Sequence, residues 1–445
     1  VNLGDPQIEI LLPDGVERQA IGSYTKGWLD DNSFVYQSDE TGYANLYVFD
    51  LVSKESRPLT SVEEQAWFRL LEIEGEKYIH QVLDRPHENV LQVLTLEGQL
   101  LGEKVLDSNV SDIGFDDKSH FIVSMTSAAS PFQADTMDIR VENGEASFAF
   151  SPAIRRPEAH LSAIQQCNVE KVEFPTFDID PATDKNRMLH AFLMTPKNPR
   201  ENEQAKLAVI TSFYGGGNYF SGQQQVFCEA GISWLSPAVR GSFGFGKDFM
   251  ALNDRDLGGD EIIDLFYGAR FLEEKLGLEP AQIGVAGGSH GGFATMRALT
   301  FPSYTNDRDE SYDFGFGMSH AGFSNIVTFY DATNIPDWII LESGDPATDW
   351  ETMQDRSPLN HTDLLESPIL LTHGSNDNRV GVSESRQFVE AAEKQGKPVT
   401  YVEFEGQGHG ISGLGNLVNF YQTRFNFLQD VVCEARGGRL PECAE

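Results

Sequence analysis

One short segment constrains the fold of this chain more than any other. QIGVAGGSHGGFATMRALT, residues 282–300, runs from a strand pattern through a glycine-rich turn into a helical pattern. Glycine is disfavoured in the interior of a strand or a helix, because ordering it costs more backbone entropy than ordering any other residue. The glycines that flank the serine of this turn are Gly287, Gly288, Gly291 and Gly292. We expect them to remove side-chain collisions at a sharp turn that lifts Ser289 above the end of a strand.

The segments around this turn alternate between strand and helix patterns from about residue 168 onward. AKLAVITSFYGGG, residues 205–217, is a buried strand pattern that runs into a glycine loop. DEIIDLFYGARFLEEKLG has apolar residues at helical spacing and ends in Gly277, a predicted C-cap. This alternation predicts an α/β domain with a doubly wound, mostly parallel sheet. Residues 300–365 show no clear pattern and are expected to be irregular.

A strand, a Gly-x-Ser-x-Gly sequence and a helix in this order are typical of the nucleophile elbow of α/β-hydrolases. Ser289 is therefore the predicted nucleophile, and the backbone amide of His290 is a predicted oxyanion donor at the helix N-terminus. The same fold places an acid and then a histidine on loops after later strands. Asp377 in ILLTHGSNDNRV and His409 in VEFEGQGHG each follow a strand pattern, in that order.

The order of these residues predicts a Ser-Asp-His triad. His409 would be the general base, and Asp377 would orient its imidazole and stabilise the cation. Taken singly, Asp377 also fits a turn cap and His409 a surface histidine. The side chains of His290, His361 and His373 are interpreted as structural. Histidines and cysteines show no metal-ligand spacing, so neither a metal nor an organic cofactor is predicted.

Residues 1–165 have a different pattern, of short strands separated by polar turns. Three strand–turn–strand stretches place Val35, Ile79 and Ile122 at matching positions, about 43 or 44 residues apart, a period typical of β-propeller blades. An unrelated β-meander is the alternative. Because closed propellers usually have four to eight blades, about three blades predict an incomplete propeller. We expect either further blades upstream of Val1, which we favour, or sheets that stay open. The predicted domains are 1–165 and 166–445.

The net charge of −35 on 445 residues is unusually negative. It disfavours nucleic acid and anionic lipid as partners, because this surface would repel their phosphates. A solubility adaptation explains it best, and attraction of cationic peptides is the alternative. No apolar run reaches the roughly 18 residues that a membrane span requires, so no membrane insertion is predicted.

The chain has four cysteines. Cys433 and Cys443 lie in a polar tail and could close a small disulfide loop, which would favour a periplasmic or secreted location over the cytoplasm. Two free thiols fit the sequence nearly as well. Cys167 and Cys228 lie in different regions and are predicted to be buried thiols.

Several motifs together resemble the prolyl oligopeptidase family of serine peptidases, which joins a β-propeller to a C-terminal α/β-hydrolase. The resemblance is strong over residues 170–432 and loose before them. The motifs that carry it are GGSHGG at the nucleophile, HGSNDNRV at the acid, GHG at the histidine, RGSFGFGKDF from Arg240, and FYGGGN. The last matches a Tyr-Gly-Gly loop whose tyrosine hydroxyl is an oxyanion donor in that family. The resemblance therefore assigns this role to Tyr214.

The resemblance also implies substrate-binding residues. Arg379, two positions after Asp377, matches an arginine that binds a substrate carbonyl in prolyl oligopeptidase, and a surface arginine is the alternative. Trp338 in NIPDWIIL matches an aromatic that stacks on a bound proline, although a core tryptophan fits equally well. Gly217 stands where prolyl oligopeptidase has a phenylalanine that lines the first pocket. The paired glutamates with which dipeptidyl peptidases hold a free N-terminus are not evident in residues 1–165.

The predicted function is that of a serine peptidase acting on oligopeptides. The alternatives are an esterase or acyl-peptide hydrolase on the same triad, and a propeller-based binding protein with an idle hydrolase domain. An intact triad argues against the binding protein. Endopeptidase or exopeptidase mode, the preferred residue at the cleavage point and the oligomeric state do not follow from the sequence.

Overall fold

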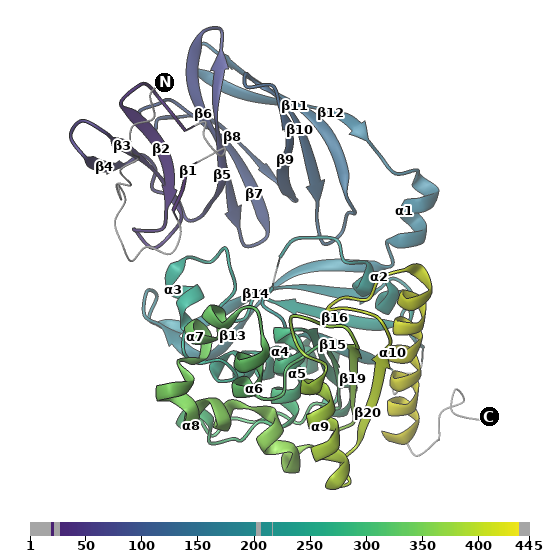
Figure 1. Cartoon of the computed structure of the whole chain (residues 1–445). Coiled ribbons are helices and arrows are strands. Elements are labelled where there is room, and N and C mark those ends of the chain that lie inside the picture. Colours follow the sequence, from purple (N-terminus) through teal and green to yellow (C-terminus); the bar gives the residue numbers. More distant parts are fainter. Residues whose placement is uncertain (1–18, 22–26, 202–205, 216, 436–445) are drawn as a thin grey trace. The chain divides into compact units, whose positions relative to one another are not determined.

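The computed structural model describes residues 19–21, 27–201, 206–215 and 217–435. The chain forms two compact units (Figure 1). The first comprises Val1–Leu161 together with two later segments, Asn218–Phe220 and Phe243–Phe249. The second comprises Ser162–Gly217, Ser221–Ser242 and Met250–Glu445.

The described part of the first unit contains three four-stranded sheets, all antiparallel and each built from strands consecutive in sequence. The first sheet is β1 (Gln19–Ile21), β2 (Ser33–Ser38), β3 (Asn45–Asp50) and β4 (Glu55–Pro58). The second is β5 (Gln65–Ile73), β6 (Glu76–Arg85), β7 (Glu88–Leu94) and β8 (Leu100–Leu106). The third is β9 (Asn109–Phe115), β10 (His120–Thr126), β11 (Gln133–Glu142) and β12 (Glu145–Ile154). Four-stranded antiparallel sheets are the units from which propeller blades are made.

The repeat positions predicted from the sequence fall on the second strand of each sheet. Val35 and Ile79 are fully buried and belong to one apolar cluster. Ile122 does not match them, because its side chain is 46% exposed. The buried residues of that strand are its neighbours Phe121 and Val123. Since successive strand residues point to opposite faces, the predicted register of the third repeat is wrong by one residue.

The second unit is built on one eight-stranded sheet of order β13-β14-β16-β15-β17-β18-β19-β20. β14 pairs antiparallel with both of its neighbours, β13 and β16. The other strands, β16, β15, β17, β18, β19 and β20 in their order across the sheet, are parallel to one another. The strands are β13 (Cys167–Asp180), β14 (Lys185–Pro196), β15 (Leu207–Thr211), β16 (Ile232–Pro237), β17 (Ile283–Gly288), β18 (Phe316–His320), β19 (Ile369–Gly374) and β20 (Val399–Phe404). Figure 1 shows the helices packed around this sheet, with the long α10 along its outside.

Helices connect these strands along the chain. The α-helices are α1 (Glu158–Ile164), α2 (Gly222–Glu229), α3 (Lys247–Met250), α4 (Asp260–Leu276), α5 (His290–Leu299), α6 (Ile326–Ala332), α7 (Pro336–Ser343), α8 (Pro346–Arg356), α9 (Ser383–Lys394) and α10 (Leu414–Ala435). The 3-10 helices are η3 (Ala251–Asn253), η4 (Pro280–Gln282), η5 (Thr305–Asp307) and η6 (Pro358–Leu364). Gly277 caps α4 in the left-handed conformation, φ 65°, as predicted. Among the described helices, none is long and apolar enough to cross a membrane.

The region 300–365 is more regular than its sequence suggests. It contributes the central strand β18 and three short helices, α6, α7 and α8. The helices have 7, 8 and 11 residues. Prolines occupy the first turns of α7 and α8, and helices this short show too few repeats for their period to be recognised.

The prediction that Cys167 and Cys228 are free thiols is wrong. The two residues form a disulfide that joins the start of β13 to α2, with 5.4 Å between their Cα atoms. The pairing could not be predicted from the sequence, because β13 and α2 become neighbours only when the chain has folded. Cys433 is disulfide-bonded as well. The predicted loop to Cys443 lies partly outside the described residues.

Candidate active site

The predicted nucleophile stands on a strained turn. β17 ends at Gly288, α5 begins at His290, and Ser289 between them has φ 57° and ψ −122°. A positive φ is uncommon for a residue with a side chain and persists only where the surrounding structure holds it. The amide of Ser289 donates to the carbonyl of His320 at 2.9 Å, which ties the turn to strand β18. The turn therefore presents a half-buried serine at the carboxyl edge of the sheet.

Close packing explains three of the four glycines around this serine. A Cβ on Gly287 would lie 2.7 Å from the backbone of Gly291, and one on Gly292 would lie 2.7 Å from the Cα of Gly322. A Cβ on Gly291 itself would approach a neighbour to 3.0 Å. The prediction of a collision is wrong for Gly288, whose Cβ would meet nothing nearer than a carbonyl oxygen at 3.5 Å. This difference follows from strand geometry, because consecutive residues face opposite sides of the sheet.

The predicted acid and base lie together at the same edge of the sheet as the serine. Asp377 follows β19, His409 follows β20, and Ser289 follows β17, all parallel strands of one sheet. The carboxylate Oδ2 of Asp377 lies 2.7 Å from Nδ1 of His409. This contact leaves Nε2 as the imidazole nitrogen that can exchange a proton with a nucleophile.

The carboxylate of Asp377 is completely buried and held by several donors. The backbone amides of Arg379 and Val380 donate to its Oδ1 at 2.9 and 3.0 Å. Burial alone would raise the pKa of Asp377, but hydrogen bonds from His373 and His409 and from these amides hold it well below its usual range. The group is therefore a fixed anion over the working range of pH.

His373, which the sequence analysis interpreted as structural, also contacts the acid. Its Nε2 lies 2.9 Å from the carbonyl oxygen of Val380 and 3.3 Å from Oδ2 of Asp377. Both of these atoms accept, so Nε2 must carry the proton. Nδ1 then accepts from the hydroxyl of Ser385 at 2.7 Å. His373 thus supplies a second imidazole donor to Asp377, a role its place four residues before the acid could have suggested.

Tyr214 lies in the loop after β15, and its ring stacks on that of His290, with 4.2 Å between centroids and 16° between planes. Its hydroxyl donates to Oε2 of Glu342 at 2.8 Å and accepts from Nδ2 of Asn253 at 2.6 Å. The hydroxyl proton predicted to face an oxyanion is therefore engaged by a carboxyl group on α7. Neither Glu342 nor Asn253 belongs to a motif that marked it in the sequence.

The imidazole of His290 is buried beneath Tyr214, and its Nε2 lies 3.0 Å from Oε2 of Glu261 on α4. Burial lowers the pKa of His290, but the charge of Glu261 acts in the opposite direction and the net effect is a raised pKa. His290 is the first residue of α5, so its backbone amide lacks a partner within the helix. The amide is available to an oxyanion while the side chain is occupied behind it.

The three predicted substrate-binding residues differ in their settings. Trp338, on α7, is half-buried and meets the ring of His290 edge-on at 5.9 Å, so it belongs to the surroundings of the elbow. Arg379 is exposed, and among the described residues its guanidinium makes no hydrogen bond or ion pair. Gly217 is exposed. Arg379 stands two residues from Asp377, and its amide holds that carboxylate.

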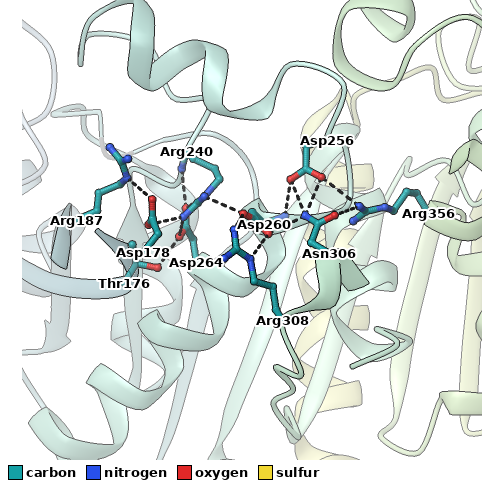
Figure 2. Close-up of polar contacts among 10 residues, drawn as sticks. All are labelled: Thr176, Asp178, Arg187, Arg240, Asp256, Asp260, Asp264, Asn306, Arg308 and Arg356. Carbon is teal, nitrogen blue, oxygen red and sulfur yellow. Dashed lines mark hydrogen bonds and ion pairs between the residues drawn. The ribbon is translucent and has the colours of Figure 1, made fainter. Parts of the chain in front are cut away.

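An ion-pair network joins β13, the loop after β16 and the start of α4 (Figure 2). Arg240, the first residue of RGSFGFGKDF, is buried with a side-chain exposure of 3%. Its guanidinium donates to Asp264 at 2.9 Å, Asp178 at 3.0 Å and Asp260 at 3.3 Å. Burial would lower the pKa of Arg240, but the three carboxylates, Asp264 foremost, raise it. The arginine is therefore permanently charged and bridges β13, the loop after β16, and α4.

The network continues along the N-terminal end of α4. Asn306 donates to Asp260 at 2.7 Å and to Asp256 at 2.9 Å, and Arg356 reaches Asp256 at 3.2 Å. Figure 2 shows these side chains following on from Arg240 in one line. The residue after Asp260 is Glu261, which pairs with the buried imidazole of His290 beside the predicted nucleophile. The network therefore fixes the start of the helix that carries this acid.

Comparison with known proteins places this geometry in context. A family model described as "Prolyl oligopeptidase family" matches residues 218–434. Dipeptidyl aminopeptidase BIII of Pseudoxanthomonas mexicana is 32% identical over 284 residues, which cover 60% of this chain and 39% of that protein. The acylamino-acid-releasing enzyme of Rattus norvegicus is 25% identical over 236 residues, which cover 50% of this chain and 31% of that enzyme. The chain thus spans well under two thirds of the length of these relatives.

A solved structure gives the match in fold. A puromycin-hydrolyzing peptidase of Mycobacterium tuberculosis superimposes with a TM-score of 0.71 at 21% identity, over 91% of this chain and 61% of the other. At this identity the match establishes the fold. It confirms the predicted class, an α/β-hydrolase domain preceded by an all-β region.

Proposed function

We propose that the chain is a serine peptidase of the prolyl oligopeptidase family that hydrolyses short peptides through an acyl-enzyme. The observation that carries the proposal is the 2.7 Å contact between Asp377 and His409 at the sheet edge where Ser289 stands on its strained turn. The contact lies at the carboxyl ends of β19 and β20, on the edge of the sheet where β17 leads into the turn that carries Ser289.

In the proposed reaction, His409 takes the hydroxyl proton of Ser289 as Oγ attacks the scissile carbonyl carbon. The developing oxyanion is held by the amide of His290 and by the hydroxyl of Tyr214. His409 then returns the proton to the leaving amine, and water repeats the sequence to release the acyl group. Asp377 keeps the imidazole in the correct tautomer and stabilises its cation throughout.

We also assign substrate contacts to three residues. Arg379 is exposed next to the acid, and its guanidinium makes no hydrogen bond or ion pair within the part of the chain that the structure describes, which suits a substrate carbonyl oxygen. Trp338 borders the elbow and would form one wall of the first pocket, while Gly217 would leave the opposite side open. We interpret residues 1–165 as part of a β-propeller and residues 166–445 as the peptidase domain, with oligopeptides as substrates.

Active-site labelling tests the proposal. A fluorophosphonate probe should label the wild-type protein and the control variant Ser303→Ala, which changes an exposed serine of the same unit. It should not label Ser289→Ala, whose peptide hydrolysis should fall by about 10⁴- to 10⁶-fold. Retention of labelling by Ser289→Ala would assign the nucleophile elsewhere, and loss of folding would show in its circular dichroism.

Acyl-peptide hydrolysis is the second candidate, because several relatives are acylamino-acid-releasing enzymes. It uses the same triad and differs in which peptide N-terminus is accepted. Matched chromogenic peptides with a free or an acetylated N-terminus separate the two. A preference for the acetylated peptide above about a hundredfold would favour the acyl-peptide hydrolase.

A further inference from the structure

The hydroxyl of Tyr214 is the centre of a small buried cluster behind the nucleophile. It donates to Glu342 and accepts from Asn253. The amide Nδ2 of Asn253 also donates to the same Glu342 oxygen, at 2.6 Å. Glu342 is 9% exposed and Asn253 is fully buried, whereas Tyr214 is half-buried. The hydroxyl of Tyr214, the amide nitrogen of Asn253 and the carboxyl of Glu342 therefore share their hydrogen bonds with one another.

The number of protons in this cluster decides what the tyrosine can do. A phenol hydroxyl has one proton to donate and two lone pairs that accept. An ionised Glu342 can only accept hydrogen bonds, so Tyr214 donates its hydroxyl proton to it in a hydrogen bond. The amide of Asn253 donates to the Tyr214 oxygen. A protonated Glu342 can donate to the Tyr214 oxygen instead. The tyrosine then accepts from both neighbours, and its own proton is free to point elsewhere.

We propose that Glu342 is a positioning residue that directs the Tyr214 proton: with its carboxyl protonated, Tyr214 donates to the reaction oxyanion, and with its carboxyl ionised, Tyr214 donates back to Glu342 and the oxyanion loses that donor. This inference rests on the proposed function, because it assumes that an oxyanion forms at Ser289. The inference assigns a role to Glu342 on α7, which no sequence motif marks. It also states that both oxyanion donors are available only when the carboxyl of Glu342 is protonated.

Burial, more than the charges around it, favours the protonated form of Glu342. The groups that face it are Tyr214 from the loop after β15, Asn253 from η3, Glu261 from α4 and His290 from α5. The imidazole of His290 pairs with Glu261, so one positive charge offsets one of the two carboxylates. Among the described residues, Glu342 forms no ion pair, and the nearby charge of His290 is shared with Glu261. Burial and the charge of Glu261 raise the pKa of Glu342, the hydrogen bonds from Tyr214 and Asn253 and the charge of His290 lower it, and the net effect is a raised pKa.

Glutamine at this position tests the proposal, because its amide donates to Tyr214 at every pH and so imitates the protonated acid. The measurement is kcat/KM of the wild type and of Glu342→Gln on one peptide from pH 5 to 9. The ratio of kcat/KM of the variant to that of the wild type should rise with pH. The total rise should not exceed about 10²- to 10³-fold, which is the usual contribution of one oxyanion donor. Glu351→Gln, an exposed acid on α8, is the control and should give a flat ratio.

A second pair isolates the tyrosine. In a Tyr214→Phe background the change from Glu342 to Gln should no longer alter the pH profile, because no hydroxyl proton remains to be directed. A flat ratio in the wild-type background, or a rising ratio that persists without the hydroxyl, would overturn the proposal. A purely structural role for Glu342 would change activity by the same factor at all pH values.

Thermal unfolding supplies a readout that does not depend on turnover. Because the pKa of Glu342 is raised in the folded protein, the stability linked to this carboxyl is complete below its unfolded pKa and is lost as pH rises through the folded pKa. The Tm of Glu342→Gln relative to wild type should therefore increase from pH 5 to pH 8. A constant difference would show that Glu342 does not change charge and would refute the switch. Absence of fluorophosphonate labelling in the wild type would instead refute the proposed function, and the switch with it.

Discussion

Two adjacent glycines of β17 offer a sharp test of how the elbow is packed. A Cβ on Gly287 would overlap the hydroxyl of Ser212 and would lie 2.7 and 2.8 Å from two backbone atoms of Gly291. Ser212 cannot turn away without cost, because its hydroxyl bonds the Gly291 carbonyl at 2.6 Å and Thr295 at 2.9 Å. A Cβ on Gly288 would find its nearest neighbours at 3.5 to 3.9 Å, ordinary van der Waals contact.

The expected effects of alanine at the two positions follow from these distances. Overpacking against fixed atoms costs about 1–3 kcal/mol, so Gly287→Ala should lower the apparent Tm by about 2–12 °C for a unit of this size. Gly288→Ala should stay within about 0.5 kcal/mol of wild type. Both residues lie in the same strand and have no positive φ, so the change in intrinsic strand preference is common to both and cancels in the comparison.

The assay is thermal unfolding of the two variants side by side, followed by circular dichroism at one pH and one scan rate. Hydrolysis measured on the same samples should fall with Gly287→Ala, because the clash displaces the turn that carries Ser289, the proposed nucleophile. Equal losses of Tm in both variants would refute the reasoning, as would a Gly287→Ala protein as stable as wild type.

Three further predictions concern the triad, the buried network and the disulfide. Asp377→Asn should lower kcat by about 10⁴-fold with little change in KM, measured on a chromogenic peptide, because the imidazole loses its tautomer and its counter-charge; a loss below tenfold would remove Asp377 from the triad. Arg240→Met should cost about 3–5 kcal/mol in chemical denaturation, because it leaves the fully buried carboxylate of Asp264 without its cation; a neutral result would show that this carboxyl takes up a proton instead. Replacing Cys167 and Cys228 together by serine should destabilise the protein by about 4 kcal/mol, because the disulfide closes a loop with a sequence separation of 61 residues and so lowers the entropy of the unfolded chain. An unchanged denaturation midpoint would contradict this.

The parts of the fold and site that could be predicted are those set by local pattern or by order along the chain. Ser289, Asp377 and His409 are marked because each follows a strand and the fold requires that order. The contact between Asp377 and His409 then follows from neighbouring parallel strands, whose carboxyl ends share one edge of the sheet. Gly277 was predictable because a C-cap is a local signal.

The parts that escaped prediction depend on contacts between distant segments. Glu342 and Asn253 meet Tyr214 only after η3, α7 and the loop after β15 have packed together, and none of them carries a local signal. The pairing of Cys167 with Cys228 has the same origin. The register error at Ile122 has another cause, because a period read from repeats tolerates a shift of one residue whereas the faces of a strand do not.

The membership of the first unit has a consequence for the order in which the chain can fold during synthesis. Asn218–Phe220 and Phe243–Phe249 belong to that unit, where the amide of Ala128 donates to Asn218 and the amide of Lys247 to the carbonyl of Gly42. Domains of a nascent chain generally fold in order from the N-terminus. Here the first unit cannot reach its final form until the ribosome has passed residue 249. By then β13 to β16 of the second unit have already been made and must wait, unpaired with β17, for the rest of their sheet.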